Sequence, residues 1–291
     1  MKRNIRSQII LNIILSVISV AILIPFLLLI SISISNEHDI ITEGYKLIPK
    51  RLDMSAYKFI FQNPDMLLSG YKITVFTSIV GTLLAVIMMS MIAYPLSQRA
   101  FKARNTIAFY LYFAGLFGGG MVPTYLLYTQ FLHLQDTIWV YLIPGWVNAF
   151  HVFMIRTYMQ GVNGEIVEAA IIDGANDFMI FIEFMIPLAK PVLATVALFN
   201  FLGRWGEWQA SMLYINNEKL YTVQYLLQKI LKNIEIINNN QFAASVASTQ
   251  NIPSETVRMA MAVSVALPAI LIFPFFQRYF VKGMTVGSVK G

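Results

Sequence analysis

The feature that most constrains this chain is a series of six apolar runs, each about 18 to 27 residues long, separated by shorter polar stretches. An α-helix rises about 1.5 Å per residue, so a run of this length crosses the roughly 30 Å hydrocarbon layer of a bilayer. The composition agrees, because 57% of the residues are hydrophobic and only 12% are charged, which is unusual for a soluble domain. The sequence therefore predicts an all-α polytopic membrane protein with six transmembrane helices.

We expect one transmembrane domain over residues 1–291, with spans at about 9–34, 73–95, 106–131, 138–155, 191–213 and 259–280. The third run contains Gly118-Gly119-Gly120 and Pro123, which should kink or locally unwind its helix. The fourth run contains Pro144 and is close to the shortest length that crosses a bilayer. Pro95 and Pro187 are expected to end helices.

Basic residues indicate which ends of the spans face the cytoplasm, because inside segments are rich in Lys and Arg. The N-terminus, the loop after the second run and the C-terminal tail carry basic residues without acidic neighbours: Lys2, Arg3, Arg6, Arg99, Lys102, Arg104, Arg278, Lys282 and Lys290. This pattern predicts a multi-pass protein of the plasma membrane with both termini in the cytoplasm. The first run is too long for the apolar part of a signal peptide and lacks a small-x-small cleavage site, so we expect it to be retained.

Net charge and residue usage argue against several other classes of function. The net charge of +6 is spread over loops beside the spans, where basic residues meet membrane lipid, so it does not indicate a nucleic-acid partner. The chain has no cysteine and only three scattered histidines, which gives no metal-site pattern. It also has no phosphate-binding glycine loop and no nucleophile motif. We therefore expect neither an enzyme nor a cofactor bound to this chain.

The predicted cytoplasmic loop, residues 157–190, departs from the rule that cytoplasmic segments are rich in Lys and Arg. Arg156 and Lys190 lie at its edges, but five acidic residues lie between them: Glu165, Glu168, Asp173, Asp177 and Glu183. A reversed charge on the cytoplasmic face indicates a protein partner with basic residues rather than lipid headgroups. The alternative is an amphipathic loop that packs beneath its own helices.

Helical geometry predicts a compact acidic projection within this loop. Asn163 is expected to cap a short helix, and Gly174 can adopt the left-handed conformation that ends one. At 100° per residue, one stripe carries Glu165, Glu168 and Ile172, and another carries Ile166, Ala169, Ala170 and Asp173. The small alanines would let another surface approach closely. After Gly174, apolar residues recur at helical spacing up to Pro187.

These residues resemble the EAA loop in the permease subunits of binding-protein-dependent ABC importers. The resemblance rests on Glu168-Ala169-Ala170, on Gly174 and on Phe184-Met185-Ile186-Pro187, where the family usually has Ile-x-Leu-Pro. The Ile-Pro pair that usually precedes the motif is replaced by Val162-Asn163. Residues 120–125, 154–158 and 281–291 also look like the carbohydrate-uptake subfamily, close to its LplC/YtcP-type permeases.

The resemblance implies the transmembrane domain of a type I ABC importer, in which this chain forms half of the translocation path for a sugar or oligosaccharide. It implies a second, non-identical permease subunit, a homodimeric cytoplasmic ATPase that holds ATP and Mg, and an extracellular solute-binding protein. The loop would lie in a groove of the ATPase and transmit its closure to the spans. The residues assigned to this coupling are Glu165, Glu168, Ala169, Ala170, Ile172, Asp173, Gly174 and Pro187.

Polar and aromatic residues inside the expected spans are candidates for the substrate path, because polar groups are costly in lipid. They are Asn148, His151, Asn200, Arg204, Trp205, Glu207 and Trp208. Arg204 and Glu207 are three residues apart and could neutralise each other on one helix face. The two tryptophans could support the apolar faces of sugars, or lie in the interfacial belt or between subunits. Asn148 and His151 could line the path or bond to a neighbouring helix.

Three other functions stay open at this stage. An ion-coupled secondary transporter is suggested by Arg204, Glu207 and the proline-containing spans, although no internal repeat supports it. Within the ABC class, the competitor is a permease for amino acids or phosphate. A non-transporting scaffold would need only the partner-binding loop. Reconstituted uptake separates the scaffold from the transporters, and the need for an ATPase subunit separates the ABC importers from the ion-coupled transporter. The ligand held by the solute-binding protein would separate the ABC permeases from one another.

Overall fold

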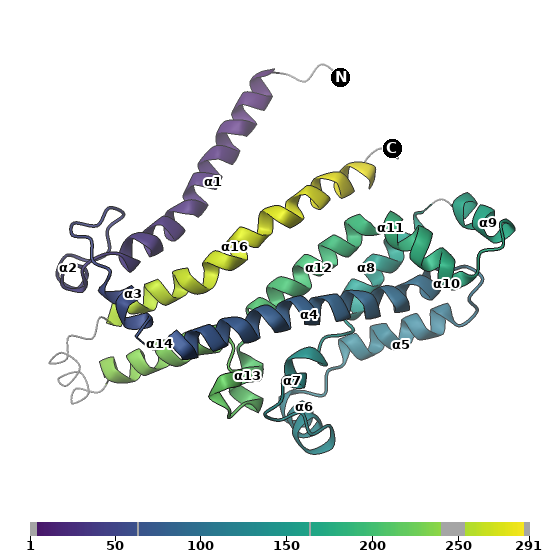
Figure 1. Cartoon of the computed structure of the whole chain (residues 1–291). Helices are drawn as coiled ribbons and strands as arrows, with labels where there is room; N and C mark the ends of the chain where they lie inside the picture. Colours follow the sequence, from purple (N-terminus) through teal and green to yellow (C-terminus); the bar gives the residue numbers. More distant parts are fainter. Residues whose placement is uncertain (1–4, 63, 163, 240–253, 288–291) are drawn as a thin grey trace. The chain divides into compact units, whose positions relative to one another are not determined.

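The computed structural model describes residues 5–62, 64–162, 164–239 and 254–287, and these residues form mainly helices (Figure 1). In this described part, extended pairing is limited to one isolated bridge between Ser35 and Leu52. The chain divides into two compact units. Unit 1 comprises Met1–Leu67 and Leu226–Pro268, and unit 2 comprises Leu68–Tyr225 and Ala269–Gly291. The predicted all-α class is confirmed.

The helices follow one another along the chain with these bounds. The first half contains α1 (Ile5–Ser33), α2 (Glu37–Glu43), α3 (Ser55–Ile60), α4 (Pro64–Ser97), α5 (Arg104–Leu116), α6 (Met121–Leu126), the π-helix η1 (Leu127–Phe131) and α7 (Trp139–Leu142). The second half contains α8 (Ala149–Gln160), α9 (Gly164–Ile172), α10 (Asp177–Met179), the π-helix η2 (Ile180–Met185), α11 (Ile186–Leu188), α12 (Lys190–Trp205), α13 (Gln209–Tyr214), the 3-10 helix η3 (Glu218–Leu220), α14 (Val223–Asn239) and α16 (Ser254–Gly287).

Several helices are long and apolar enough to cross a membrane. Single helices supply three such stretches, Gln8–Ser33, Pro64–Ser97 and Glu255–Ile272. Two bent pairs meet the same test jointly, Arg104–Leu116 with Met121–Phe131 at 108° and Asp177–Leu188 with Lys190–Trp205 at 77°. By length and composition the described residues therefore hold three to five candidate spans. The count of six spans stays a prediction.

Glycine and proline explain where the apolar runs are broken. The 108° bend falls between α5 and α6, as expected for Gly118-Gly119-Gly120, and Gly120 has a φ of 85° that favours glycine. The expected fourth span, 138–155, is not one helix, because α7 ends at Leu142 and α8 begins only at Ala149. Pro144 and Gly145, with a φ of 83°, lie in the gap.

Pro95 and Pro187 do not end their helices, contrary to the prediction. α4 continues past Pro95 to Ser97, and the helical run that contains Pro187 ends at Leu188. The π-helix η2 precedes Pro187, and a π turn shifts the hydrogen-bond register where a proline supplies no N–H. Pro191 lies in the first turn of α12, where its N–H would have no helical acceptor.

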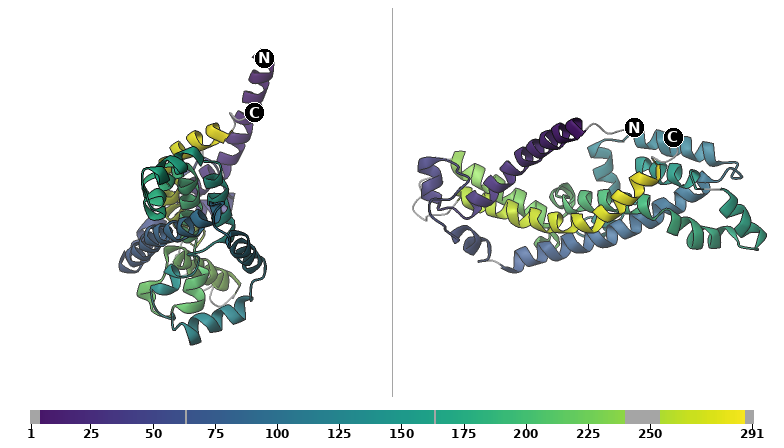
Figure 2. Two further views of the ribbon diagram at one scale, coloured as in Figure 1. Left: turned by 90° about the vertical axis from the view of Figure 1, so that its right-hand side faces the viewer. Right: turned by 90° about the horizontal axis from the view of Figure 1, so that it is seen from above.

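The apolar core of unit 2 joins α4, α8, η2 and α12. Figure 2 draws the ribbon of the chain from two further directions. Met89, Ile155 and Met185 are fully buried there. Ala85 has no exposed surface, and such small residues let helices approach closely. The same cluster includes Ala170 of α9, so this core fixes the segment 164–172 to the long helices of the unit.

Unit 1 is held by polar contacts at the N-terminus of α16. The Glu37 carboxylate accepts hydrogen bonds from the backbone N–H groups of Glu255 at 2.9 Å and Thr256 at 2.8 Å, and from the Thr256 hydroxyl at 2.7 Å. A carboxylate in this place satisfies helix N–H groups that have no other acceptor. The Tyr45 hydroxyl also donates to Glu255 at 3.1 Å. The segment after α1 is thus tied to the start of α16.

Candidate functional site: a cavity and a coupling projection

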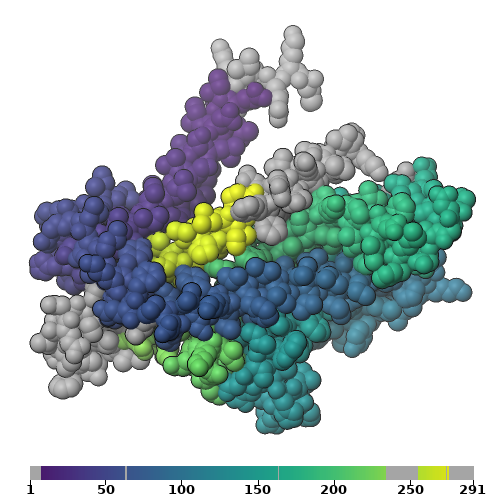
Figure 3. Space-filling model, viewed as in Figure 1, coloured from purple at the N-terminus to yellow at the C-terminus, as the bar shows by residue number. Residues whose placement is uncertain are grey.

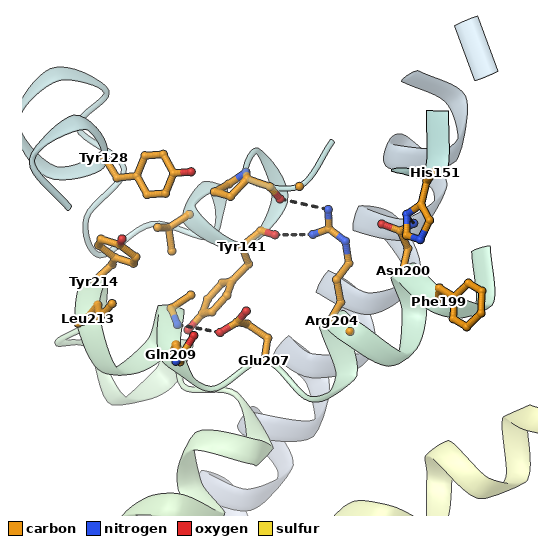
Figure 4. A pocket seen from close by; sticks show the side chains of 15 residues that line it. Tyr128, Tyr141, His151, Phe199, Asn200, Arg204, Glu207, Gln209, Leu213 and Tyr214 are labelled. Carbon is orange, nitrogen blue, oxygen red and sulfur yellow. Dashed lines mark hydrogen bonds between the residues drawn. The ribbon is translucent and has the colours of Figure 1, made fainter. Parts of the chain in front are cut away.

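Unit 2 contains a cavity of about 450 Å³ (Figure 4). Its wall is formed by residues of η1, α8, α12 and α13 and by the segment around α7. The lining includes aromatic and polar side chains: Tyr128, Tyr141, Phe199, Tyr214, His151, Asn200, Arg204, Glu207 and Gln209. A concave site that combines rings with a few placed polar groups suits a polar organic ligand.

The guanidinium of Arg204 is bonded to backbone carbonyls in the cavity wall. Its Nη1 donates to the carbonyl of Tyr141 at 2.5 Å, and its Nη2 donates to the carbonyls of Pro144 at 3.3 Å and Leu142 at 3.5 Å. These carbonyls lie at the end of α7 and in the turn that follows, where helical carbonyls lack intrahelical partners. Arg204 therefore supports the chain break that forms one side of the cavity (Figure 4).

Glu207 also forms hydrogen bonds that hold the backbone around it. Its Oε1 accepts a hydrogen bond from the N–H of Ala210 at 2.9 Å, and its carbonyl accepts one from the Thr222 hydroxyl at 2.8 Å. It lies in the break between α12, which ends at Trp205, and α13, so the predicted fifth span is interrupted here. Within the described structure no ion pair joins Glu207 to Arg204. The sequence suggested that Arg204 and Glu207 would pair with each other, but both side chains bond to main-chain groups instead.

His151, Asn200 and Phe199 form one edge of the cavity. Nδ2 of Asn200 lies 3.2 Å from Nδ1 of His151 and donates to the carbonyl of Val196 at 3.0 Å. When Nδ2 donates to Nδ1, the histidine carries its proton on Nε2, so the pair offers one donor and the amide oxygen as an acceptor. The Phe199 ring is parallel to the imidazole within 3°, with centroids 6.1 Å apart. An aromatic face beside a donor and an acceptor suits a hydroxylated ring.

Tyrosines lie on the other side of the cavity (Figure 4). The Tyr214 ring contacts those of Tyr128 and Tyr125, with centroids 5.5 Å and 5.6 Å apart. The Tyr141 hydroxyl is 2.6 Å from Oγ of Ser211 in a buried hydrogen bond. None of these tyrosines was among the predicted site residues. The signal that could have found them is a hydroxyl inside an apolar run, because such a group must find a partner.

Asp136 ties the turn before α7 to the end of α13. Its carboxylate accepts hydrogen bonds from the backbone N–H groups of Asn216 at 2.5 Å and Asn217 at 2.9 Å, and its own N–H donates to the Tyr214 carbonyl at 3.0 Å. The backbone N–H groups of Asn217 and Asn216 hold the pKa of the Asp136 carboxyl below its usual value. His133 and Asp136 have φ values of 47° and 55°, which are costly outside glycine. This strained turn holds Tyr214 in the cavity wall.

The predicted coupling segment forms a projection at one end of unit 2 (Figures 1 and 3). α9 ends at Ile172, and Gly174 has a φ of 85°, which confirms the predicted reversal of the chain. The predicted N-cap, Asn163, lies outside the described residues. Pro187 is exposed on the helical run that follows. The acidic side chains of the segment are exposed as well: Glu165, Glu168, Asp173, Asp177 and Glu183.

Large apolar side chains are exposed on the same projection. Ile172 is 85% exposed, Phe178 65% and Ile171 55%. Ala170 is only 4% exposed and belongs to the core of unit 2, so Ala169 alone of the two alanines is open to another surface. Phe178 and Ile171 were not among the predicted coupling residues. Their spacing in the sequence fits a buried face equally well, and only the fold shows them exposed.

Comparison with known proteins identifies the family. The chain is 34% identical over 271 residues to protein LplC of Bacillus subtilis. The aligned region covers 92% of this chain and 90% of that protein. It is 32% identical over 270 residues to the polygalacturonan/rhamnogalacturonan transport system permease protein YtcP of the same organism, with 92% of each chain covered. A chain in a crystal structure of a bacterial ABC transporter, involved in the import of the acidic polysaccharide alginate, matches with a TM-score of 0.81. That match has 30% identity and covers 96% of this chain and 98% of the other. The chain belongs to the permeases of ABC importers.

This permease is a multi-pass membrane transport subunit and not an enzyme. As an ABC importer permease, it works with an ATPase and a solute-binding protein. No family model matches the chain.

The permease brings four of the seven predicted path residues together in the cavity wall: His151, Asn200, Arg204 and Glu207. The other three lie elsewhere. The Asn148 side chain caps α8 by accepting the N–H of His151 at 3.1 Å. Trp205 is 5% exposed and stacks on Phe201 with centroids 5.7 Å apart, and Trp208 is outside the lining of this cavity. Tyrosines and Phe199 supply the aromatic surface instead.

Proposed function

We propose that this permease forms half of the translocation path for a sugar or oligosaccharide across the plasma membrane, with both termini in the cytoplasm. The observation that carries the proposal is the cavity of unit 2, in which aromatic rings lie beside hydrogen-bonding side chains. Sugars present apolar faces and hydroxyl edges, which such a lining binds by stacking and by hydrogen bonds. The names of two similar proteins, which concern polygalacturonan, rhamnogalacturonan and alginate, support the same class of substrate.

The proposed partners complete the path and drive it. A second, non-identical permease subunit supplies the other half, and an extracellular solute-binding protein delivers the sugar. ATP and Mg bind to a homodimeric cytoplasmic ATPase and not to this chain. The projection of α9, Gly174 and α10 enters a groove of that ATPase, where its apolar side chains become buried and its acidic residues meet basic ones.

The route from the ATPase to the sugar follows one continuous stretch of chain. The helical run Asp177–Leu188 leaves the projection and joins α12 at a bend of 77°. α12 carries Asn200 and Arg204 into the cavity wall. Ala170 fixes α9 to the same core that holds α12. A movement of the projection would thus reach the cavity through packed helices and a bend that can act as a hinge.

The test uses the assembled complex in proteoliposomes, with the ATPase and the solute-binding protein present. Gly174→Val places a branched side chain at a φ of 85°, and Glu168→Lys reverses a charge on the projection. We expect either change to lower ATP-driven sugar uptake and sugar-stimulated ATP hydrolysis about tenfold or more. Sugar binding by the isolated solute-binding protein should not change. Unchanged uptake and hydrolysis in both variants would refute the coupling assignment.

The same vesicles test the ion-coupled alternative. Uptake by the permease subunits alone, driven by an imposed ion gradient, is expected to be absent. Gradient-driven uptake without the ATPase would contradict the proposed function.

A further inference from the structure

Gly81 of α4 leaves a slot for the guanidinium of Arg204. A Cβ atom added at Gly81 would lie 2.5 Å from Nη1 of Arg204 and 2.7 Å from its Cζ, which is closer than non-bonded atoms approach. Gly81 itself is buried. Any side chain at this position must therefore displace the end of the arginine, while the backbone of α4 can stay in place.

From this slot the guanidinium reaches the non-helical turn between α7 and α8. α7 has only four residues, and the chain is not helical again until Ala149. Pro144 lacks an N–H, and Gly145 has a φ of 83°. Arg204 adds hydrogen bonds to the carbonyls of Tyr141, Leu142 and Pro144 from a charged donor. Such bonds are stronger than those between neutral groups.

We propose that Arg204 is a positioning residue: held in the Gly81 slot, it fixes the turn at residues 143–148 as a wall of the cavity. It thereby sets the affinity of the cavity for its substrate without binding the substrate. Its planar guanidinium can donate in several directions at once, which a lysine ammonium at the same place does not reproduce. The transport part of this inference rests on the proposed function, but the position of the turn can be measured independently of transport.

A nitroxide at Val147→Cys reports on the turn directly. The chain contains no cysteine, so a label added to this subunit before assembly attaches at one place, and Val147 is 42% exposed. In the assembled complex in nanodiscs, we expect Arg204→Gln and Gly81→Ala each to increase the mobility of the nitroxide. Ser78→Ala is the matched control on α4, because Oγ of Ser78 has no hydrogen-bond partner among the described residues. An unchanged spectrum in Arg204→Gln overturns the proposal.

Uptake kinetics then separate positioning from direct binding. The probes are trigalacturonate, which is acidic, and galactotriose, which is uncharged. We expect Arg204→Gln, Arg204→Lys and Gly81→Ala each to raise KM about tenfold for whichever probe is transported, with kcat changed less than about twofold. Gly81→Ala should add little to Arg204→Gln, because both act through the same guanidinium.

Two kinetic results would contradict positioning. One is a native KM for trigalacturonate in Arg204→Lys, which would mean that charge alone matters. The other is full additivity of Gly81→Ala and Arg204→Gln. If the complex transports neither probe, the proposed substrate class fails, and the nitroxide spectra still decide the role of Arg204.

Discussion

The cavity and the coupling projection of this permease use their side chains in opposite ways. In the cavity wall, the Arg204 and Glu207 side chains are bonded to backbone groups of the same chain. On the projection, Ile172 and Phe178 are 85% and 65% exposed. The cavity is therefore organised by hydrogen bonds within the chain, whereas the projection carries exposed apolar surface.

This difference indicates what each region contributes. Clustered, exposed apolar side chains mark interaction surfaces, and burying one isoleucine or phenylalanine stabilises a complex by about 1.5–3 kcal/mol. Groups that are already held in place lose little freedom when a ligand binds, so they favour affinity and selectivity. Changes on the projection should therefore alter assembly with the ATPase, and changes in the cavity should alter the KM for sugar.

The largest effect is expected from Ile172→Asp on the projection. It removes the most exposed apolar side chain of the projection and places a charge where a partner surface should cover it. Together these costs reach about 3 kcal/mol, or about a 100-fold weaker association with the ATPase. The measurement is the amount of ATPase that stays bound to a tagged permease during purification.

Ile41→Asp is the matched control for this experiment. Ile41 is 69% exposed, but it lies in α2 of unit 1. Because α2 follows the first expected span and the N-terminus is expected in the cytoplasm, α2 is expected on the outer side of the membrane. The Ile41→Asp permease should retain as much ATPase during purification as the native permease. Equal retention by Ile172→Asp would mean that the apolar surface of the projection does not contact the ATPase.

A smaller effect is expected from Phe199→Ala in the cavity. The change removes an aromatic face that stacks on His151 and lines the cavity. We expect KM for sugar to rise about tenfold, corresponding to about 1.4 kcal/mol, while the association with the ATPase stays native. Phe150→Ala is the matched control, because Phe150 also contacts His151 but does not line the cavity. An equal rise in KM for both variants would place the sugar elsewhere.

Local sequence patterns predicted part of both regions. The cost of polar groups in lipid singled out His151, Asn200, Arg204 and Glu207, and all four line the cavity. The need for a left-handed residue after a short helix predicted the turn at Gly174. The turn could be predicted because its physical cause acts within a few residues of the chain, whereas the role of the four cavity residues in transport stays a prediction.

The partners of those residues could not be predicted in the same way. Arg204 bonds to carbonyls about 60 residues earlier in the chain, so its pairing depends on how α12 packs beside α7 and not on Glu207 three positions away. Trp205 and Ala170 are also buried, and their burial depends on how the helices of unit 2 pack against one another. Pro187 continues its helix because a π-helix precedes it, and a proline-based rule does not include that adjustment.

Asp136→Asn tests whether the hydrogen bonds from backbone N–H groups to the Asp136 carboxylate stabilise the turn before α7. The asparagine keeps the shape but loses the charge that accepts the N–H groups of Asn216 and Asn217. We expect the thermal midpoint of the complex in detergent to fall by about 2–4 °C at pH 7. Asn216→Ala is the control for side-chain loss, because it keeps the backbone N–H that Asp136 accepts. A midpoint in Asp136→Asn equal to that of the native protein would show that the turn does not depend on the charge.

The pH dependence of this effect has a defined sign. The folded protein holds the pKa of Asp136 below its usual value of 3.8, so the carboxylate stabilises the fold at pH values above 3.8. This stabilisation is lost as the pH falls through the lower pKa of the folded state. The difference between native and Asp136→Asn midpoints should therefore be constant from pH 7 to about pH 5 and shrink below about pH 4.

The smallest effect is expected where charged side chains pair with each other at the surface and not with the backbone. In unit 1, Nε of Arg51 donates to Asp39 at 2.8 Å, and Nη2 donates to its other oxygen. The Arg51 side chain is 59% exposed, and solvent screens such pairs. We expect Arg51→Gln to lower the thermal midpoint by less than about 2 °C, and 1 M salt to abolish the difference.

Lys58→Gln is the matched control for this surface pair, because it removes the same charge from an exposed position on α3. The Arg51 side chain holds the pKa of the Asp39 carboxyl below its usual value, so the small contribution should disappear as the pH falls below 3.8. A fall in the thermal midpoint that is larger in Arg51→Gln than in Asp136→Asn would reverse the expected order of the two effects. It would mean that pairing between exposed side chains stabilises this permease more than carboxylate bonds to the backbone do.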